Sequence, residues 1–174
     1  SKGQTVSTYT QDVGIADRDS TFRDRQLQSG VGVASTVEMN APAGSYHGGH
    51  IYGTQNGGGT DALNMIGMRS DINSVPKGGH ATGPHYGDTY YGMERDNTGL
   101  LTGGNYHVTD PETGVIGYLK GHQGPGASVG LEVHLTRHGD VGTPEFIHVF
   151  RDINRGEILD EFRFDNFLGT PKGQ

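Results

Sequence analysis

The last third of the chain alternates apolar and polar residues, with turn-forming sequences between the alternating segments. Successive side chains of a β-strand point to opposite faces, so this alternation is typical of strands with one buried face. At 129–136, every second position is apolar: Val129, Leu131, Val133 and Leu135. Together with turn sequences such as DPETG and NRGE, the pattern predicts five antiparallel strands, at 106–109, 115–119, 129–136, 146–152 and 158–164.

The first third of the chain is less regular. Residues 1–20 are polar and without a clear period, and we expect an extended or weakly strand-like entry. Residues 21–30 predict a short helix or turn that ends at a glycine. Residues 31–40 mix β-branched residues with alternation and predict a strand that stops at APAG. A second short strand is expected at 49–52, followed by a loop at 55–60.

Helical spacing of apolar residues begins in the middle of the chain. Residues 61–73 have this spacing, with Thr60 or Asp61 available as the N-cap, and predict a helical or partly helical segment. Residues 74–88 contain prolines and several glycines and predict a loop, whereas 90–101 predict another short helix. The predicted fold class is therefore α+β, with a central antiparallel β-sheet and glycine-rich loops.

Composition limits the classes of function. A chain of 174 residues fits one domain, here 1–174, and 31% hydrophobic residues with 31 glycines predict a small core among long ordered loops. The absence of cysteine excludes disulfides, thiolate zinc sites and cysteine nucleophiles. A net charge of -7 disfavours unassisted binding of a phosphate backbone, so a nucleic-acid enzyme of this charge would need a bound cation and local arginines. No apolar run is long enough to indicate a membrane partner.

Histidines and one serine are the first candidates for chemistry. The sequence YHGGH at 46–50 carries His47 and His50, which would point to opposite faces of a strand and therefore form a poor metal clip. Seven further histidines are available to complete a metal shell: His80, His85, His107, His122, His134, His138 and His148. GASVG at 126–130 matches a nucleophile elbow but lacks the preceding strand and following helix, so a catalytic serine is not favoured.

A stronger candidate combines His50 with Asn64 and Asn73 in one compact segment. An imidazole near neutral pKa can take a proton from water, and an amide oxygen is a hard neutral ligand suited to a water-rich Mg²⁺. Such a pair is the minimum for metal-assisted phosphodiester hydrolysis, in which the cation stabilises the charge on the phosphate. Taken singly, each asparagine could equally be a helix cap or a turn residue.

The same segment reads HGGHI, then GGGTDAL, then NMIGMRSDIN. It resembles the DNA/RNA non-specific endonuclease family, whose ββα-metal (His-Me finger) core carries DRGH or DxGGHLI, a glycine-rich loop and NLVPMxxxxN. The spacing from Asn64 to Asn73 matches that of the family. Upstream, RDRQLQSGVG resembles the stretch before the family's motif; downstream, YYGMER resembles its helix with an internal Glu, and EFRFDN its closing hairpin. The likeness spans most of 21–167 and is specific around 48–73.

The resemblance implies a fold and a set of roles. It implies a ββα-metal core at about 31–101, with C-terminal antiparallel strands at about 106–167. The implied roles are His50 as general base, Asn73 as metal ligand, Asn64 as a brace of the site, Arg23 or Arg25 as the residue that holds the scissile phosphate, and Glu94 as an outer carboxylate.

Two departures from the family pattern concern His47 and Glu94. The family often has Asp three residues before the base, where this chain has His47, so support or proton relay at that position is altered. The helix after the metal-binding asparagine usually continues to the Glu, whereas this chain inserts 74–88, and the assignment of Glu94 depends on how that insertion folds.

The expected function is a metal-dependent endonuclease that hydrolyses DNA, or RNA, with little sequence preference, using Mg²⁺ or Mn²⁺. The chain begins at Ser1 and shows no secretory leader, which suggests a domain cut from a larger protein. By family habit this would be the toxin domain of a secreted bacterial protein, delivered into the cytoplasm of a target cell and silenced by an immunity protein.

Two alternatives stay open. One is a non-catalytic β-rich metal-binding or interaction domain, in which histidines hold a structural or regulatory metal. The other is a nuclease fold that has lost its activity through the replacement at His47.

Overall fold

The protein has an α+β fold built on antiparallel sheets. The computed structural model describes residues 4–13, 24–56, 58–74, 89–102, 105–109, 116–120, 129–137, 139–153 and 158–168. Two single 3-10 turns, Thr54–Asn56 and Ala62–Asn64, flank a loop in the first half. The helices and strands are β1 (Gln4–Val13), α1 (Arg25–Glu38), β2 (Tyr46–His50), β3 (Met65–Arg69), α2 (Ser70–Asn73), α3 (Tyr90–Leu101), β4 (Asn105–Thr109), β5 (Ile116–Lys120), β6 (Val129–Arg137), β7 (Phe146–Ile153) and β8 (Ile158–Asp165).

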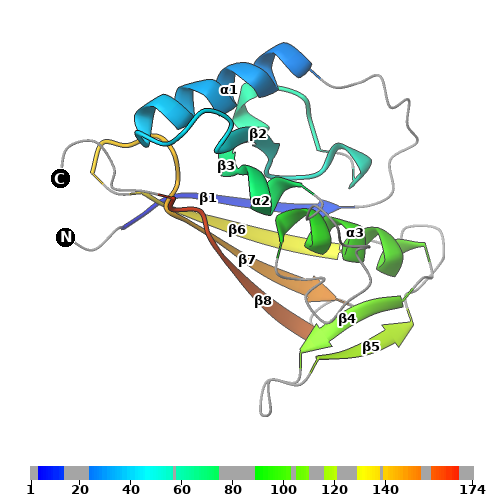
Figure 1. Cartoon of the computed structure of the whole chain (residues 1–174). Helices are drawn as coiled ribbons and strands as arrows, with labels where there is room; N and C mark the ends of the chain where they lie inside the picture. Colours follow the sequence, from blue (N-terminus) through cyan, green and yellow to red (C-terminus); the bar gives the residue numbers. More distant parts are fainter. Residues whose placement is uncertain are drawn as a thin grey trace.

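Three antiparallel sheets organise the chain. The largest has four strands in the order β1-β6-β7-β8, and the two smaller sheets are the pairs β2-β3 and β4-β5. The pair β2-β3 lies between α1 and the four-stranded sheet, with α2 and α3 on the same side of that sheet (Figure 1). No helix in the described part of the chain has the length and apolar character needed to cross a bilayer.

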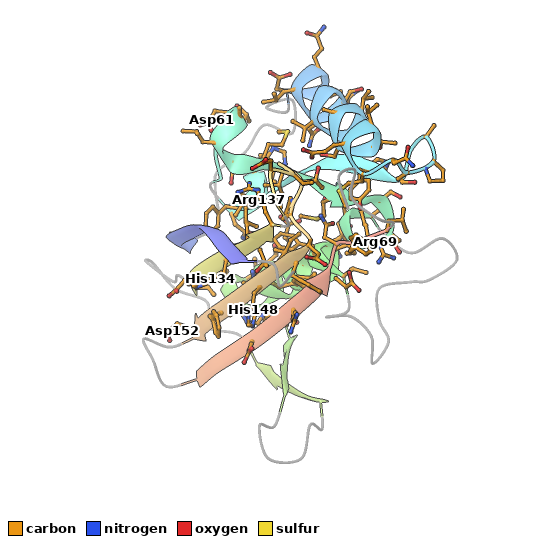
Figure 2. The ribbon with its side chains drawn as sticks, turned by 90° about the vertical axis from the view of Figure 1, so that its left-hand side faces the viewer. Asp61, Arg69, His134, Arg137, His148 and Asp152 are labelled. Atoms are coloured by element: carbon orange, nitrogen blue, oxygen red, sulfur yellow. The ribbon has the colours of Figure 1, made fainter. Side chains whose placement is uncertain are left out.

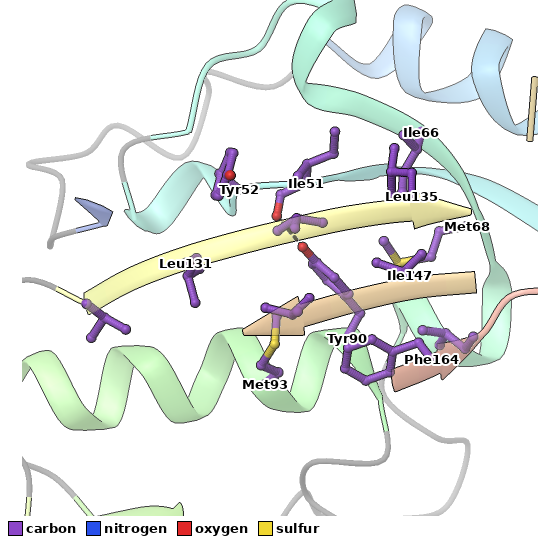
Figure 3. Packing of buried hydrophobic residues seen from close by; sticks show 14 of the residues in the cluster. Ile51, Tyr52, Ile66, Met68, Tyr90, Met93, Leu131, Leu135, Ile147 and Phe164 are labelled. Atoms are coloured by element: carbon purple, nitrogen blue, oxygen red, sulfur yellow. Dashed lines mark hydrogen bonds between the residues drawn. The ribbon is translucent and has the colours of Figure 1, made fainter. Parts of the chain in front are cut away.

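One hydrophobic core lies between the four-stranded sheet and the layer formed by β3, α2 and α3 (Figure 3). On β6 the four alternating residues expected to share a face are all buried, which confirms that prediction. In the register of the sheet, Leu135 lies across from Ile147, and Ile147 across from Phe164, so three strands contribute one continuous apolar row. Met68 and Met93 close this row from the opposite layer.

The five C-terminal strands and the helix at 90–101 were predicted correctly, with bounds that agree within one residue. The polar entry forms a full strand, β1, paired along its length with β6. The second short strand was placed slightly late, because β2 spans Tyr46–His50 rather than 49–52. The predicted loop at 74–88 lies outside the described residues.

The strand predicted at 31–40 is wrong, because this segment belongs to helix α1. Asp24 begins the helix by accepting a hydrogen bond from the Leu27 backbone N–H at 2.9 Å, and the helix continues through the glycine at which a stop was expected. Its buried face follows helical spacing but uses mostly small residues, which an apolar pattern does not reveal: Gly32, Ser35, Thr36 and Met39. The valines that suggested a strand, Val33 and Val37, are exposed.

The helix predicted over 61–73 is also largely wrong. Asp61 does cap, accepting from the backbone N–H groups of Leu63 and Asn64, but only a single 3-10 turn follows. The chain then forms β3, because Met65–Arg69 pairs with β2 and is buried on both faces along most of its length. Helix remains only in the single turn of α2. Tertiary pairing has overridden local helical spacing here.

A buried asparagine fastens the β2-β3 pair to the C-terminal end of the large sheet. The Asn166 side chain donates to the carbonyls of Gly67 at 2.9 Å and Pro144 at 2.7 Å, and accepts from the Arg69 backbone N–H at 2.7 Å. The Tyr46 hydroxyl donates to the Asn166 carbonyl at 2.8 Å. These hydrogen bonds join residues that are distant in sequence beneath α1.

Candidate functional site

The residues expected to carry chemistry meet around the β2-β3 pair. His50 is the last residue of β2 and pairs in register with Met65, the first residue of β3, so Asn64 lies at the same end of the pair. Helix α2 follows β3 directly and brings Asn73 back alongside β2. A Cβ built on Gly49 would lie 2.9 Å from the Asn73 side-chain oxygen, which places that oxygen beside the residue that precedes His50.

The glycine pair before His50 has two separate packing reasons. A Cβ on Gly48 would approach the Gln28 carbonyl oxygen to 2.4 Å, so the backbone of α1 rests directly on β2 at this point. A Cβ on Gly49 would meet the Asn73 amide and Met68 instead. Glycine therefore lets α1 and α2 approach β2 from its two faces, immediately before the histidine.

His50 is largely buried, with 9% of its surface exposed. Its Nε2 atom is inaccessible to solvent. Its Nδ1 atom faces α1, 3.4 Å from the side-chain nitrogen of Gln28. A glutamine amide can present either its NH₂ group or, after a half-turn, its oxygen to an imidazole nitrogen. Gln28 is thus placed to support either protonation state of the imidazole, and Nδ1 is the nitrogen directed toward the groove wall.

Asn64 acts as a brace, and its amide is occupied by backbone contacts. Its side-chain oxygen accepts from the Tyr52 N–H at 2.9 Å, and its NH₂ group donates to the carbonyls of Tyr52 at 2.9 Å and Gly59 at 2.7 Å. Its own carbonyl accepts from the Ile51 N–H at 2.9 Å. Both amide protons are used, so this side chain fixes the loop after His50.

We expect Asn64→Ala to lower the free energy of unfolding by about 3 kcal/mol, because the three side-chain hydrogen bonds of Asn64 are lost and the backbone groups that they satisfied are left without this partner. Urea unfolding followed by circular dichroism measures the change. Gln26→Ala, at an exposed position of α1, is the matched control and should stay within about 0.5 kcal/mol of the wild type. Equal stability of the two variants would contradict the bracing role.

Helix α3 reaches the site through Tyr90. This fully buried tyrosine donates a hydrogen bond to the carbonyl of Ile51, the residue after His50 (Figure 3). Burial raises the pKa of Tyr90 well above its ordinary value, and the nearby Glu94 carboxylate and Tyr52 raise it further. The Tyr90 hydroxyl therefore keeps its proton. Glu94 is half-buried and lies near Tyr90, one helical turn further along α3.

The remaining predicted site residues lie in three places. Arg25 is exposed at the first position of α1, one helical turn before Gln28. His47 is exposed and lies on β2 opposite Met68, so it does not form a clip with His50. Arg23 lies outside the described residues, as do the first residues of the 126–130 motif.

The histidines of the large sheet lie away from this site. His134 and His148 face each other across β6 and β7 on the outer surface of the sheet, where they pair with Glu132 and Glu161 (Figure 2). Among the residues that the structure describes, no group of three or more His, Asp or Glu side chains is arranged to hold a metal ion. Of the other candidate histidines, His107 lies on β4 opposite Tyr118, and four lie outside the described residues: His80, His85, His122 and His138.

An open groove of about 700 Å³ lies between α1, β2 and α2, and Gln28, the neighbour of His50 Nδ1, lines it. Its walls are the face of α1 from Gln28 to Val37, the segment 43–48 that leads into and along β2, and the end of α2 with Asn73. Gln28 and Asn73, which flank His50 and its preceding glycine, thus also form part of the groove. The contact of Gln28 with His50 was not predicted from the sequence. Gln28 follows the capping Asp24 by four residues, and nothing else in the sequence of α1 distinguishes it from its neighbours.

A single amide oxygen beside Gly49 fits the coordination habit of Mg²⁺, which keeps several waters and takes few protein ligands. Asn73 would be the residue that holds such a cation. The chain matches no family model, and no curated protein shows significant sequence similarity to it. Its function is therefore inferred from the geometry of the site.

Proposed function

We propose that this protein is a metal-dependent endonuclease whose β2-β3-α2 unit is a ββα-metal core similar to that of the DNA/RNA non-specific endonucleases. The observation that carries the proposal is that Asn73 and Gln28, the neighbour of His50 Nδ1, line one groove beside the Gly48–Gly49 pair. A base and a hard oxygen ligand, each close to one groove, are the two groups that hydrolysis of a phosphodiester requires.

The chain's own residues divide the work. His50 accepts a proton from the attacking water through Nδ1, since Nε2 is inaccessible to solvent. Gln28, 3.4 Å from Nδ1, must turn its amide aside for this transfer, and Asn64 and Tyr90 fix the backbone after His50. A divalent cation held by Asn73 would supply positive charge to the phosphate as negative charge develops there.

The acidity of the protein makes local positive charge important. With a net charge of -7, long-range attraction of a phosphate backbone is weak, so a bound cation and Arg25, one turn from Gln28 at the start of α1, would supply the positive charge. We assign Glu94 a supporting position on α3 behind Tyr90. If the domain is delivered as a toxin into the cytoplasm of a target cell, an immunity protein that covers this face would silence it.

Plasmid cleavage tests the proposal. Supercoiled DNA should be nicked with Mg²⁺ or Mn²⁺ and left intact with EDTA, and Asn73→Ala should slow nicking by about 100-fold because the metal loses its protein ligand. Asn40→Gly is the matched control, since Asn40 is exposed, lies in the left-handed region (φ 51°) that glycine adopts freely, and is remote from Asn73 in sequence. Cleavage that persists in EDTA, or in Asn73→Ala at the wild-type rate, would contradict the metal-dependent mechanism.

A further inference from the structure

We propose that the groove lined by Gln28 and Asn73 binds an unpaired nucleoside of the substrate, so that the enzyme prefers single-stranded RNA or DNA to duplex. This inference rests on the proposed nuclease function and adds a substrate class to it. The groove is the described cavity that contains both Gln28 and Asn73, the two side chains that flank the His50 region. A nucleotide chain whose phosphate is held at Asn73 therefore has a neighbouring nucleoside within the groove.

The chemistry of the groove fits an uncharged sugar and base better than a phosphate. Among its described lining residues none is Lys, Arg, Asp or Glu, so the walls offer no positive track for a backbone. The polar groups that line it are backbone and side chains without a fixed charge, among them the amides of Gln28 and Asn73, the hydroxyl of Ser29 and the imidazole of His47. Such groups recognise base and sugar edges, which an unpaired nucleoside exposes.

The apolar part of the groove comes from the two valines of α1. Val33 and Val37 lie one helical turn apart and are 62% and 59% exposed, although both line the groove. Exposed β-branched residues on a helix have no role in its core packing, and here they offer an apolar surface to the face of a base. A base that is paired and stacked inside a duplex cannot reach this surface.

The test separates binding from catalysis. Anisotropy of short fluorescein-labelled oligonucleotides, measured in EDTA with the wild-type protein and with Val33→Gln/Val37→Gln, reports on the groove alone. Both substitutions replace an exposed valine by a better helix former, so the fold is retained. We expect single strands to bind about tenfold more tightly than the same sequence as duplex, and the double variant to lose about tenfold for single strands. Parallel RNA and DNA single strands show which sugar is preferred.

Leu63→Gln is the matched control, because Leu63 is 79% exposed and lies outside the groove, and it should bind as the wild type does. Equal binding of single strand and duplex, or an unchanged affinity in the double valine variant, would overturn the groove assignment. Hydrolysis of bis(p-nitrophenyl) phosphate, which needs no groove, reports separately on His50 and Asn73. Its absence would count against the proposed nuclease function, while the binding result would still decide the groove.

Discussion

His50→Ala is expected to slow metal-dependent plasmid cleavage by about 10²–10⁴-fold, the range that a positioned general base contributes. The reason is geometric: Nδ1 of His50 is the nitrogen that faces the Gln28 side of the site, and alanine offers no base there. Nicking rates of wild type and variant under the same Mg²⁺ or Mn²⁺ conditions measure the effect, with thermal unfolding to show that the variant is folded.

His134→Ala serves as the control for loss of a histidine, because His134 lies on the outer surface of the large sheet, away from the core (Figure 2). Its cleavage rate should equal that of the wild type. Equal rates for His50→Ala and the wild type would rule out His50 as the base. If the wild type itself does not cut, but His47→Asp does, the chain is a nuclease scaffold silenced at position 47.

The second large effect concerns stability. Asp96→Ala should lower the free energy of unfolding by about 3–5 kcal/mol, because it removes the carboxylate that balances a fully buried guanidinium. The Arg151 side chain is 0% exposed and donates from Nη1 to Asp96 at 2.7 Å and to Asn97 at 2.9 Å. Its guanidinium carbon also lies 4.8 Å from the centre of the Phe162 ring. This cluster joins α3 to the interior of the large sheet.

Asp71→Ala provides the comparison, since Asp71 forms an ion pair with Arg69 at 2.5 Å but its side chain is 63% exposed. An exposed pair contributes at most about 1 kcal/mol, because water and salt screen it. Urea unfolding of both variants measures the difference. Losses of similar size would show that the Arg151 cluster is not the link between α3 and the sheet.

The sequence predicted most of the large sheet because its strands alternate cleanly and one face is buried, as at Val133 and Leu135. It failed for α1, where the buried face consists of small residues such as Gly32 and Ser35 that carry no apolar signal. It failed again at β3, where strand formation depends on pairing with β2 rather than on local preference. A single sequence does not encode such pairings in a local pattern.

The same distinction holds for the candidate site. His50, Asn64 and Asn73 could be chosen because their residue types and spacing carry chemistry, and the structure gathers them around one strand pair. Gln28 could not be chosen, because it reaches His50 only through the close contact of α1 with Gly48. The sequence also does not show that the two asparagines have different roles. The hydrogen bonds of Asn64 make it a brace, whereas the amide of Asn73 lies beside Gly49.

The clamp made by Asn166 has a consequence for the order of synthesis. It closes on the backbone of Arg69, which precedes it by 97 residues, so the ribosome has released the β2-β3 pair long before the clamp exists. Strands β6, β7 and β8, which the clamp joins to that pair, are also made late. A nascent or truncated chain that ends before Asn166 therefore carries every catalytic candidate but holds them less firmly. Full assembly of the site therefore waits until Asn166 has left the ribosome.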